Sequence, residues 1–282
     1  GDDLGNNAAN WEPAVVPASA TERSDPPGPP HNDANVARFP NDGTTTVIEA
    51  GIDAVAFAVQ LGHPKGGAFG NQSASNTLNM TGGTLTTQGN FLFNVGRGTN
   101  VDPNHLAQFN VSGGVVNAAG ITVPEAFSPG LGSVGINAEM HVSGDAIVNT
   151  DLLRLGSNDA NSLITVSDNA QINLTDDNNG FANGQLWLES FEDLDDTGGT
   201  SVLDIRDNGV GRIHGGVNNI QDDQAASAGI IINELIPRGM ILANGGSGPN
   251  GTVGVSLDGG VITLRAVPEP ATAALALLFS AA

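Results

Sequence analysis

Residues 78–85 read LNMTGGTL, and the pattern in this short stretch is the clearest indication of the fold. Apolar and polar residues alternate up to Met80, which is the pattern of a half-buried strand, and two glycines then mark a tight turn. An aliphatic residue, Leu85, resumes the pattern five positions after Met80. The stretch therefore predicts a strand, a turn and a second strand.

Variants of this block recur along the chain, which indicates a repeat architecture. The first three copies are 31 residues apart, measured at Gly82, Gly113 and Gly144, and the fourth follows after 24 residues. In five of the six copies, an aliphatic residue follows the last inward-facing strand residue by five positions; the copy at 164–172 is one residue longer. The further copies are 109–116 (FNVSGGVV), 140–147 (MHVSGDAI), 164–172 (ITVSDNAQI), 203–210 (LDIRDNGV) and 255–262 (VSLDGGVI).

A second signature, an aliphatic residue followed by glycine, lies between copies, as at Leu155–Gly156. Each repeat thus offers several short strands, which cannot bury their apolar face until neighbouring repeats stack on them. We expect an all-β fold, a parallel β-helix or β-solenoid, over residues 44–265. The side chains predicted to stack inward are Leu78, Met80, Phe109, Val111, Met140, Val142, Ile164 and Val166.

Three other segments carry their own expectations. Residues 1–43 predict an N-terminal strand and loop region with a proline-rich insert, SDPPGPP at 24–30, since proline cannot donate to a sheet ladder. Residues 54–61 (AVAFAVQL) alternate with period two and predict one strand, with its large residues Val55, Phe57, Val59 and Leu61 on one face. Residues 224–236 (QAASAGIIINELI) can be read as helical, but Gly229 followed by three isoleucines favours a strand.

The charge of the chain limits its partners. Thirty acidic residues against nine basic ones give a formal net charge of -21. This charge opposes binding to a nucleic acid or to an anionic membrane surface. The chain has no cysteine, so disulfides and thiolate metal sites are excluded.

The chain ends with VPEPATAALALLFSAA at 267–282, which closely resembles the PEP-CTERM sorting signal of exported bacterial proteins. In that signal a Pro-Glu-Pro tripeptide precedes a membrane helix and a short basic cluster. Pro268, Glu269 and Pro270 match the tripeptide, and a short C-terminal helix is expected from Ala271. Residues 271–282 match only the start of a span, because about twenty apolar residues are needed to cross a bilayer. The basic cluster is missing, so over 266–282 we expect a truncated or degenerate signal.

The body of the chain is similar to the autotransporter-like solenoids that often carry this signal. The similarity rests on Asn10–Trp11, on blocks of the Thr-Gly-Gly and Ser-Gly-Gly type, and on strands that end in Leu-Gly. The resemblance implies export, processing by an exosortase-type enzyme, and transient membrane insertion through the C-terminal segment. It places the mature protein at the cell envelope surface or in the extracellular matrix, and it implies no chemistry.

The sequence offers few metal ligands in a recognised pattern. The five histidines are scattered, and the parity of His141 predicts a solvated side chain. No cofactor is expected. Calcium is left open because acidic loops could offer it hard oxygens, although none matches the EF-hand spacing or the nonapeptide of calcium-binding solenoids. The calcium candidates are Asp176, Asp177, Asp193, Asp195 and Asp196.

Two functions remain after these exclusions. We predict an exported structural or adhesive solenoid with no catalytic residue. The alternative is a carbohydrate-binding or polysaccharide-cleaving β-helix, either a lyase or a glycoside hydrolase, for which paired carboxylates beside a basic residue are required. Arg206 and Arg212, close to Asp204 and Asp207, are the best candidates for that chemistry. Convergence of acidic and arginine side chains in one groove would favour the alternative.

Overall fold

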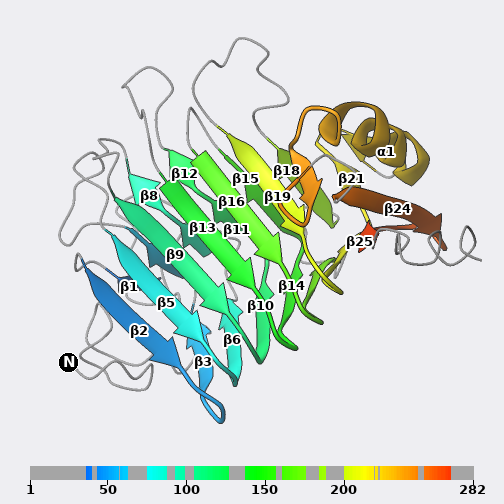
Figure 1. Ribbon diagram of the computed structural model, residues 1–282. Coiled ribbons are helices and arrows are strands. Elements are labelled where there is room, and N and C mark those ends of the chain that lie inside the picture. Colours follow the sequence, from blue (N-terminus) through cyan, green and yellow to red (C-terminus); the bar gives the residue numbers. More distant parts are fainter. Residues whose placement is uncertain are drawn as a thin grey trace, which may run out of the picture.

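The chain winds through three long sheets, and each coil adds one strand to each sheet (Figure 1). The computed structural model describes residues 36–39, 43–56, 58–62, 75–87, 93–98, 105–126, 137–156, 161–175, 184–188, 200–218, 220–221, 223–246 and 251–267. The proline-rich insert and the helix expected from Ala271 lie outside these ranges.

Each sheet is a ladder in which every strand is hydrogen-bonded to the next. Sheet A contains, in spatial order, β2 (Thr44–Ile48), β5 (Asn76–Met80), β9 (Leu106–Val111), β13 (Asn137–Val142), β16 (Asn161–Val166), β19 (Ser201–Ile205) and β23 (Ile241–Ala243). Sheet B contains β1 (Val36–Phe39), β4 (Ala58–Leu61), β7 (Phe93–Val95), β11 (Ile121–Val123), β15 (Leu152–Leu155), β18 (Gln185–Leu188), β21 (Gly216–Val217) and β22 (Ile220–Gln221). Sheet C contains β3 (Asp53–Ala56), β6 (Thr84–Thr87), β10 (Val115–Ala118), β14 (Ile147–Thr150), β17 (Gln171–Leu174), β20 (Val210–Ile213), β25 (Val261–Val267) and β24 (Thr252–Asp258). A short pair joins β8 (Arg97–Gly98) to β12 (Glu125–Ala126).

The register of sheet A follows the sequence repeat. Leu78 pairs with Phe109, Phe109 with Met140, and Met140 with Ile164, all in parallel. The eight side chains predicted to stack inward are all fully buried. The prediction of a parallel β-solenoid is therefore confirmed.

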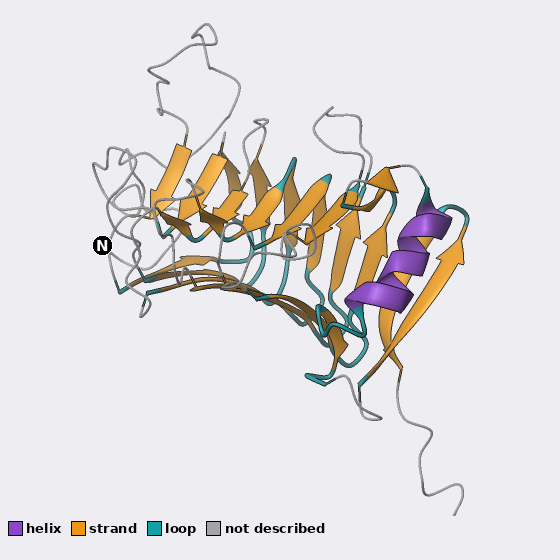
Figure 2. Ribbon diagram, turned by 90° about the horizontal axis from the view of Figure 1, so that it is seen from above, coloured by secondary structure: helices purple, strands orange, loops and turns teal. Residues whose placement is uncertain are grey.

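The core lies between the three sheets and runs along the axis of the stack. Figure 2 shows the stacked strands of these sheets from above. It is built from aliphatic residues of successive coils, with few aromatic ones. The rings of Phe93 in sheet B and Phe109 in sheet A meet across it, with centroids 4.7 Å apart. Removing such apolar surface from water is the main driving force for stacking the coils.

The turn between sheets A and C is also stacked in register. The amide of Ser112 donates to the carbonyl of Met80 at 2.8 Å, and the amide of Ser143 donates to the carbonyl of Val111 at 2.8 Å. This turn needs a left-handed residue, and Gly114 supplies it with φ +84°. In the later coils Asp168 and Asp207 adopt φ values of 56° and 52°, which aspartate tolerates better than most residues.

Two repeat copies, at 140–147 and at 203–210, have a longer turn than their sequence indicates. In the copy at 140–147, Ile147 stands five positions after Val142, but Val148 is the residue that pairs with Val116 and points inward. Ile147 is half-buried on the outer face. The expected five-residue spacing is wrong there because Ala146 adds one residue to the turn. In the copy at 203–210, Val210 pairs with the outward Gln171, and Gly211 pairs with the inward Ile172.

Residues 54–61 do not form the single strand that their alternation predicts. The segment divides into β3 of sheet C and β4 of sheet B, so it turns a corner of the solenoid. In β3 the small residues Ala54 and Ala56 are buried and Val55 is half-buried. The predicted face of large residues is therefore wrong in β3, where the alanines point inward, but Val59 and Leu61 of β4 are fully buried in the core as predicted.

A helix lies where three consecutive isoleucines favoured a strand, so that prediction is wrong. Helix α1 (Gln224–Ile230) continues into the π-helical turn η3 (Ile231–Leu235). Asp223 caps α1, since its carboxylate accepts from the amide of Ala226 at 2.9 Å. Ile231 and Leu235 are fully buried and belong to the core. These contacts explain the helix: its apolar face covers the last coil (Figure 1).

The last sequence copy, 255–262, is not a coil of the solenoid. Strands β24 and β25 form an antiparallel hairpin, and β25 pairs antiparallel with β20. Gly259 and Gly260 both have positive φ, which a two-residue hairpin turn requires. The hairpin ends sheet C, whereas the coil after β19 continues at β23. The sequence does not distinguish the two arrangements, because a strand-glycine-strand pattern is compatible with both a solenoid coil and an antiparallel hairpin.

Candidate functional site

Most of the residues predicted as sites lie outside the described residues. This holds for the tripeptide Pro268, Glu269 and Pro270. It also holds for the calcium candidates Asp176, Asp177, Asp193, Asp195 and Asp196. The structure does describe the residues proposed for polysaccharide cleavage.

Asp204 and Arg206, two of those residues, form an ion pair at the end of sheet A. The Arg206 Nε donates to Asp204 Oδ2 at 2.6 Å, and the amide of Gly245 donates to Asp204 Oδ1 at 3.0 Å. The carboxylate is buried and both oxygens are engaged. Asp204 therefore links the turn at 244–246 to the preceding coil by a hydrogen bond. Its carboxylate has a structural role.

Arg212 lies apart from this ion pair, on the outer face of sheet C. There it ends a row of amide side chains, one from each of three coils. Asn149 Nδ2 donates to Asn117 Oδ1 at 2.9 Å, and Asn173 Nδ2 donates to Asn149 Oδ1 at 3.0 Å. Arg212 Nη1 then donates to Asn173 Oδ1 at 3.1 Å and to Gln171 Oε1 at 2.6 Å. We call Asn117, Asn149 and Asn173 the amide row; its dipoles all point the same way and polarise one another.

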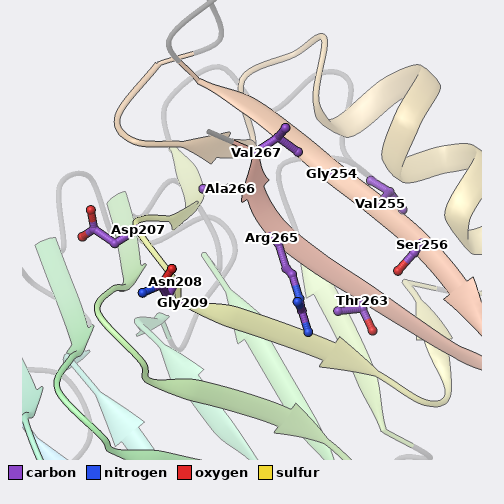
Figure 3. A pocket seen from close by; sticks show the side chains of 10 residues that line it. All are labelled: Asp207, Asn208, Gly209, Gly254, Val255, Ser256, Thr263, Arg265, Ala266 and Val267. Carbon is purple, nitrogen blue, oxygen red and sulfur yellow. The ribbon is translucent and has the colours of Figure 1, made fainter. Parts of the chain in front are cut away.

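A hollow of about 430 Å³ lies between the hairpin and the turn at 207–209. Arg212 does not line it, but Thr263, its partner in the ladder, does. Its polar lining comes from Asp207, Asn208, Ser256, Thr263 and Arg265 (Figure 3). The Arg265 side chain extends toward Thr263, whereas the Asp207 carboxylate points away from that guanidinium (Figure 3). Beside the Arg265 guanidinium, the polar groups that the hollow offers a ligand are the Asn208 amide and the Ser256 and Thr263 hydroxyls.

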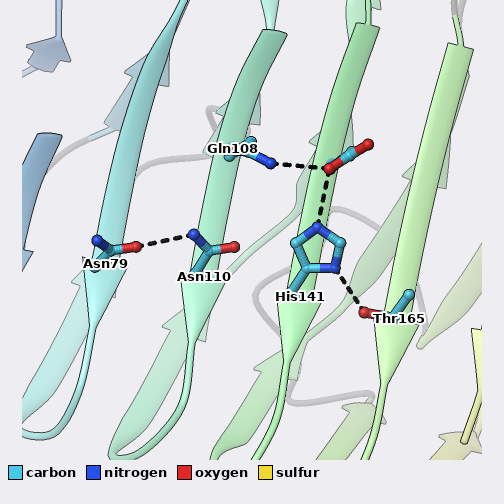
Figure 4. A network of polar contacts seen from close by, with 6 residues as sticks. Asn79, Gln108, Asn110, His141 and Thr165 are labelled. Atoms are coloured by element: carbon cyan, nitrogen blue, oxygen red, sulfur yellow. Dashed lines mark hydrogen bonds and ion pairs between the residues drawn. The ribbon is translucent and has the colours of Figure 1, made fainter. Parts of the chain in front are cut away.

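A second polar network lies on the outer face of sheet A (Figure 4). Gln108 Nε2 donates to Glu139 Oε2 at 2.9 Å, and His141 Nε2 lies 3.0 Å from the same oxygen. His141 Nδ1 is 2.7 Å from Thr165 Oγ1. Because an ionised carboxylate only accepts hydrogen bonds, His141 Nε2 carries a hydrogen. The outward position predicted for His141 is confirmed, but its side chain is 32% exposed and bonded on both nitrogens, so it belongs to a network and is not a free solvated group.

This network changes the acidity of Glu139. Burial by itself raises the pKa of the Glu139 carboxyl, but hydrogen bonds from Gln108 and His141, together with the charge of His141, hold its pKa below the ordinary value of 4.5. Hydrogen bonds to the charged form always act in this direction. Glu139 is therefore a stable carboxylate at neutral pH, which suits an electrostatic role better than proton donation.

A groove of about 500 Å³ runs beside this network along sheet A. Its polar lining includes Asn137, Glu139 and Asn161, and its apolar lining includes Leu163 and Val202. Asn161 Nδ2 donates to Asn137 Oδ1 at 3.0 Å, and Thr200 Oγ1 donates to Asn161 Oδ1 at 3.0 Å. Amides again join neighbouring coils here. The groove carries the negative charge of Glu139, whereas the hollow on sheet C contains both Arg265 and Asp207.

The polar networks on the outer faces of sheets A and C were not predicted from the sequence, because the sequence pattern was used only to find the residues that point inward. The residues that form the amide row stand at the same outward position of successive copies, each one residue after an inward aliphatic residue. That periodicity is a signal that could have found them. The position of Arg265 beside the amide row could not have been predicted. The sequence pattern indicates another coil at 255–262, whereas the observed hairpin places Arg265 on sheet C.

Within the described ranges, no three histidine, aspartate or glutamate side chains lie close enough together to hold a metal ion. In the same part of the chain, no helix has the length and apolar character needed to cross a membrane. Compared with known proteins, the chain matches no family model, and neither a curated protein nor a solved structure is significantly similar to it.

Proposed function

We propose that the chain is an exported structural or adhesive solenoid of a bacterial cell surface or extracellular matrix, and that it acts without catalysis. The observation that carries this proposal is the amide row, in which polar side chains of successive coils bond to one another. Side chains used in this way strengthen a scaffold and present a long polar face to the surroundings.

The carboxylates in the described ranges add support. Asp204 is engaged by Arg206 and Gly245, and Glu139 is engaged by Gln108 and His141. Each has partners that stabilise the fold, whereas hydrolysis needs two carboxyl groups on either side of a bound sugar. Export is proposed from the tail resemblance at Pro268, Glu269 and Pro270, with an exosortase-type enzyme as the processing partner.

The test is an attachment assay with the source bacterium. Deleting the gene should reduce attachment or the recovery of matrix, and the wild-type gene should restore it. Complementation with Phe109→Ala, which removes a fully buried ring, should fail, whereas Leu257→Ala, at a residue 45% exposed, should succeed. Unchanged attachment and matrix in the deletion strain would refute the structural role.

A second candidate function is polysaccharide binding. It is favoured by the hollow at Arg265 and by the amide row, whose last partner, Arg212, pairs with Thr263 of the hollow's lining. Amides and arginine are good donors to sugar hydroxyls and acid groups. The described outer faces of sheets A and C give this candidate two different surfaces, one negative at Glu139 and one positive at Arg265.

A further inference from the structure

Positive charge is concentrated at one corner of a strongly acidic protein. The chain has nine basic residues against thirty acidic ones. Three of the arginines, Arg206, Arg212 and Arg265, belong to the last coil and the hairpin that covers it. Arg206 is paired with Asp204, but Arg212 and Arg265 form no ion pair with any residue that the structure describes. Two uncompensated charges therefore face outward from sheet C.

The two guanidinium groups are placed to act together. In the antiparallel ladder Arg212 pairs with Thr263 and Val210 pairs with Arg265, so the two arginines are diagonal neighbours. Such neighbours are about 7–8 Å apart, within reach of one another for long side chains. The alternate residues Ile262 and Leu264 are fully buried, which fixes the outward direction of Arg265. One acid group, or two acid groups on adjacent units of a polymer, can therefore bind both guanidinium groups.

The hollow provides further donors beside these charges. Asn208, Ser256 and Thr263 line it together with Arg265 (Figure 3). Arg212 uses Nη1 for Gln171 and Asn173, and the other guanidinium hydrogens have no partner in the described part of the chain. Charge-assisted bonds from arginine to a carboxylate or a sulfate are the strong ones, because both partners are ionised.

The surface leading to the arginines suits a chain of sugars. The amide row crosses the coils, and neighbouring strands are about 4.8 Å apart, so each coil offers one amide to a polymer that runs across it. Val115 and Ile147 form a half-buried apolar row beside it, two residues away in each strand. A sugar ring has an apolar face of C–H groups and an edge of hydroxyls, which match these two rows.

We infer that the outer face of sheet C binds an acidic polysaccharide, with Arg212 and Arg265 bonding its acid groups and the amide row bonding hydroxyls of the neighbouring units. This inference rests on the second candidate function and names its site and the chemistry of its ligand. Glu139 places a negative charge on sheet A, so the charges direct an anionic polymer to sheet C.

Binding of polygalacturonate, dextran sulfate and uncharged dextran to the purified full chain tests the inference by isothermal titration. We expect one or both acidic polymers to bind, with an affinity that falls as salt is added, and dextran to bind far more weakly. Arg265→Gln and Arg212→Gln should each weaken binding about tenfold. Arg238→Gln, which removes the same charge from an exposed turn, should leave the affinity unchanged. A preference for polygalacturonate assigns the group as carboxylate, and a preference for dextran sulfate assigns it as sulfate.

Thermal unfolding of each variant separates loss of binding from loss of fold, and Arg265→Gln should unfold like the wild type because its side chain is exposed. Equal binding of dextran and the acidic polymers would overturn the assignment of an anionic ligand while leaving polysaccharide binding in place. Binding of an acidic polymer that Arg265→Gln and Arg212→Gln leave unchanged would overturn the site. Failure of all three polymers to bind would overturn the second candidate function as well.

Discussion

Asn149 Nδ2 donates a hydrogen bond to Asn117 Oδ1 at 2.9 Å, between residues 32 positions apart in the sequence. The same Asn149 accepts from Asn173 on its other side, so one side chain joins three coils. A residue with two such bonds stabilises the stack of coils through hydrogen bonds to neighbouring coils, even though asparagine has a low intrinsic propensity for β-strands.

Replacing Asn149 with alanine should therefore destabilise the protein by about 1–2 kcal/mol, because two half-buried hydrogen bonds are lost. Urea unfolding followed by circular dichroism measures the change. Asn208→Ala is the control, since its side chain is exposed and its bond to Asn169 is 3.5 Å long. An equal effect of the two substitutions would argue against a stabilising amide row.

The core should be far more sensitive than the surface. Phe109 is fully buried against Phe93, and Phe109→Ala should cost about 3–5 kcal/mol through the cavity it leaves. Leu257 is 45% exposed on the hairpin, so Leu257→Ala should stay within about 0.5 kcal/mol of the wild type. Chemical unfolding of both variants checks this, and a mild Phe109→Ala variant would contradict the stacked core.

Gly114 should tolerate no side chain. A Cβ there would lie 2.4 Å from the carbonyl oxygen of Gly83 in the preceding coil, and φ is +84°. Gly260 has a similar φ of +80°, but a Cβ there meets nothing within 4 Å. Alanine at 260 should cost about 1–2 kcal/mol from the left-handed conformation alone. Alanine at 114 should cost clearly more, and equal unfolding midpoints of the two variants would refute the close stacking of turns.

The inward positions of the solenoid could be predicted because a repeated apolar parity leaves no other face for Leu78 or Met140. The corner after Ala56 could not be predicted, since in β3 the small alanines point inward and the larger Val55 points outward, which is the reverse of the usual pattern of burial. The helix at 224–235 depends on tertiary contacts of Ile231 and Leu235 with the end of the core, and these override the strand preference of isoleucine. The candidate site on sheet C depends on the hairpin pairing with β20, which no local pattern specifies.

Acid should remove the stabilising contribution of Glu139. Its pKa is lowered in the folded state, so the contribution is fully present above the ordinary value of 4.5 and is lost as the pH falls through the folded-state pKa. The difference in unfolding free energy between the wild type and Glu139→Gln should therefore shrink as the pH falls below 4.5. Chemical unfolding as a function of pH measures it. Gln108→Ala, which removes one hydrogen bond to the carboxylate, should reduce the same difference at neutral pH, and a difference that grows on acidification would contradict this assignment.

The measurement that tests the proposed role most directly is mass spectrometry of the protein released by protease from intact cells of the source organism. Proline at 268 and 270 disfavours helix in the residues before them, which leaves an extended stretch for a processing enzyme to recognise. We predict that peptides of the solenoid are released from unbroken cells and that the C-terminal peptide ends close to Pro268, Glu269 and Pro270. A fully exported protein that retains residues 271–282 would contradict the sorting signal, and solenoid peptides recovered only after cell lysis would contradict a role at the cell surface.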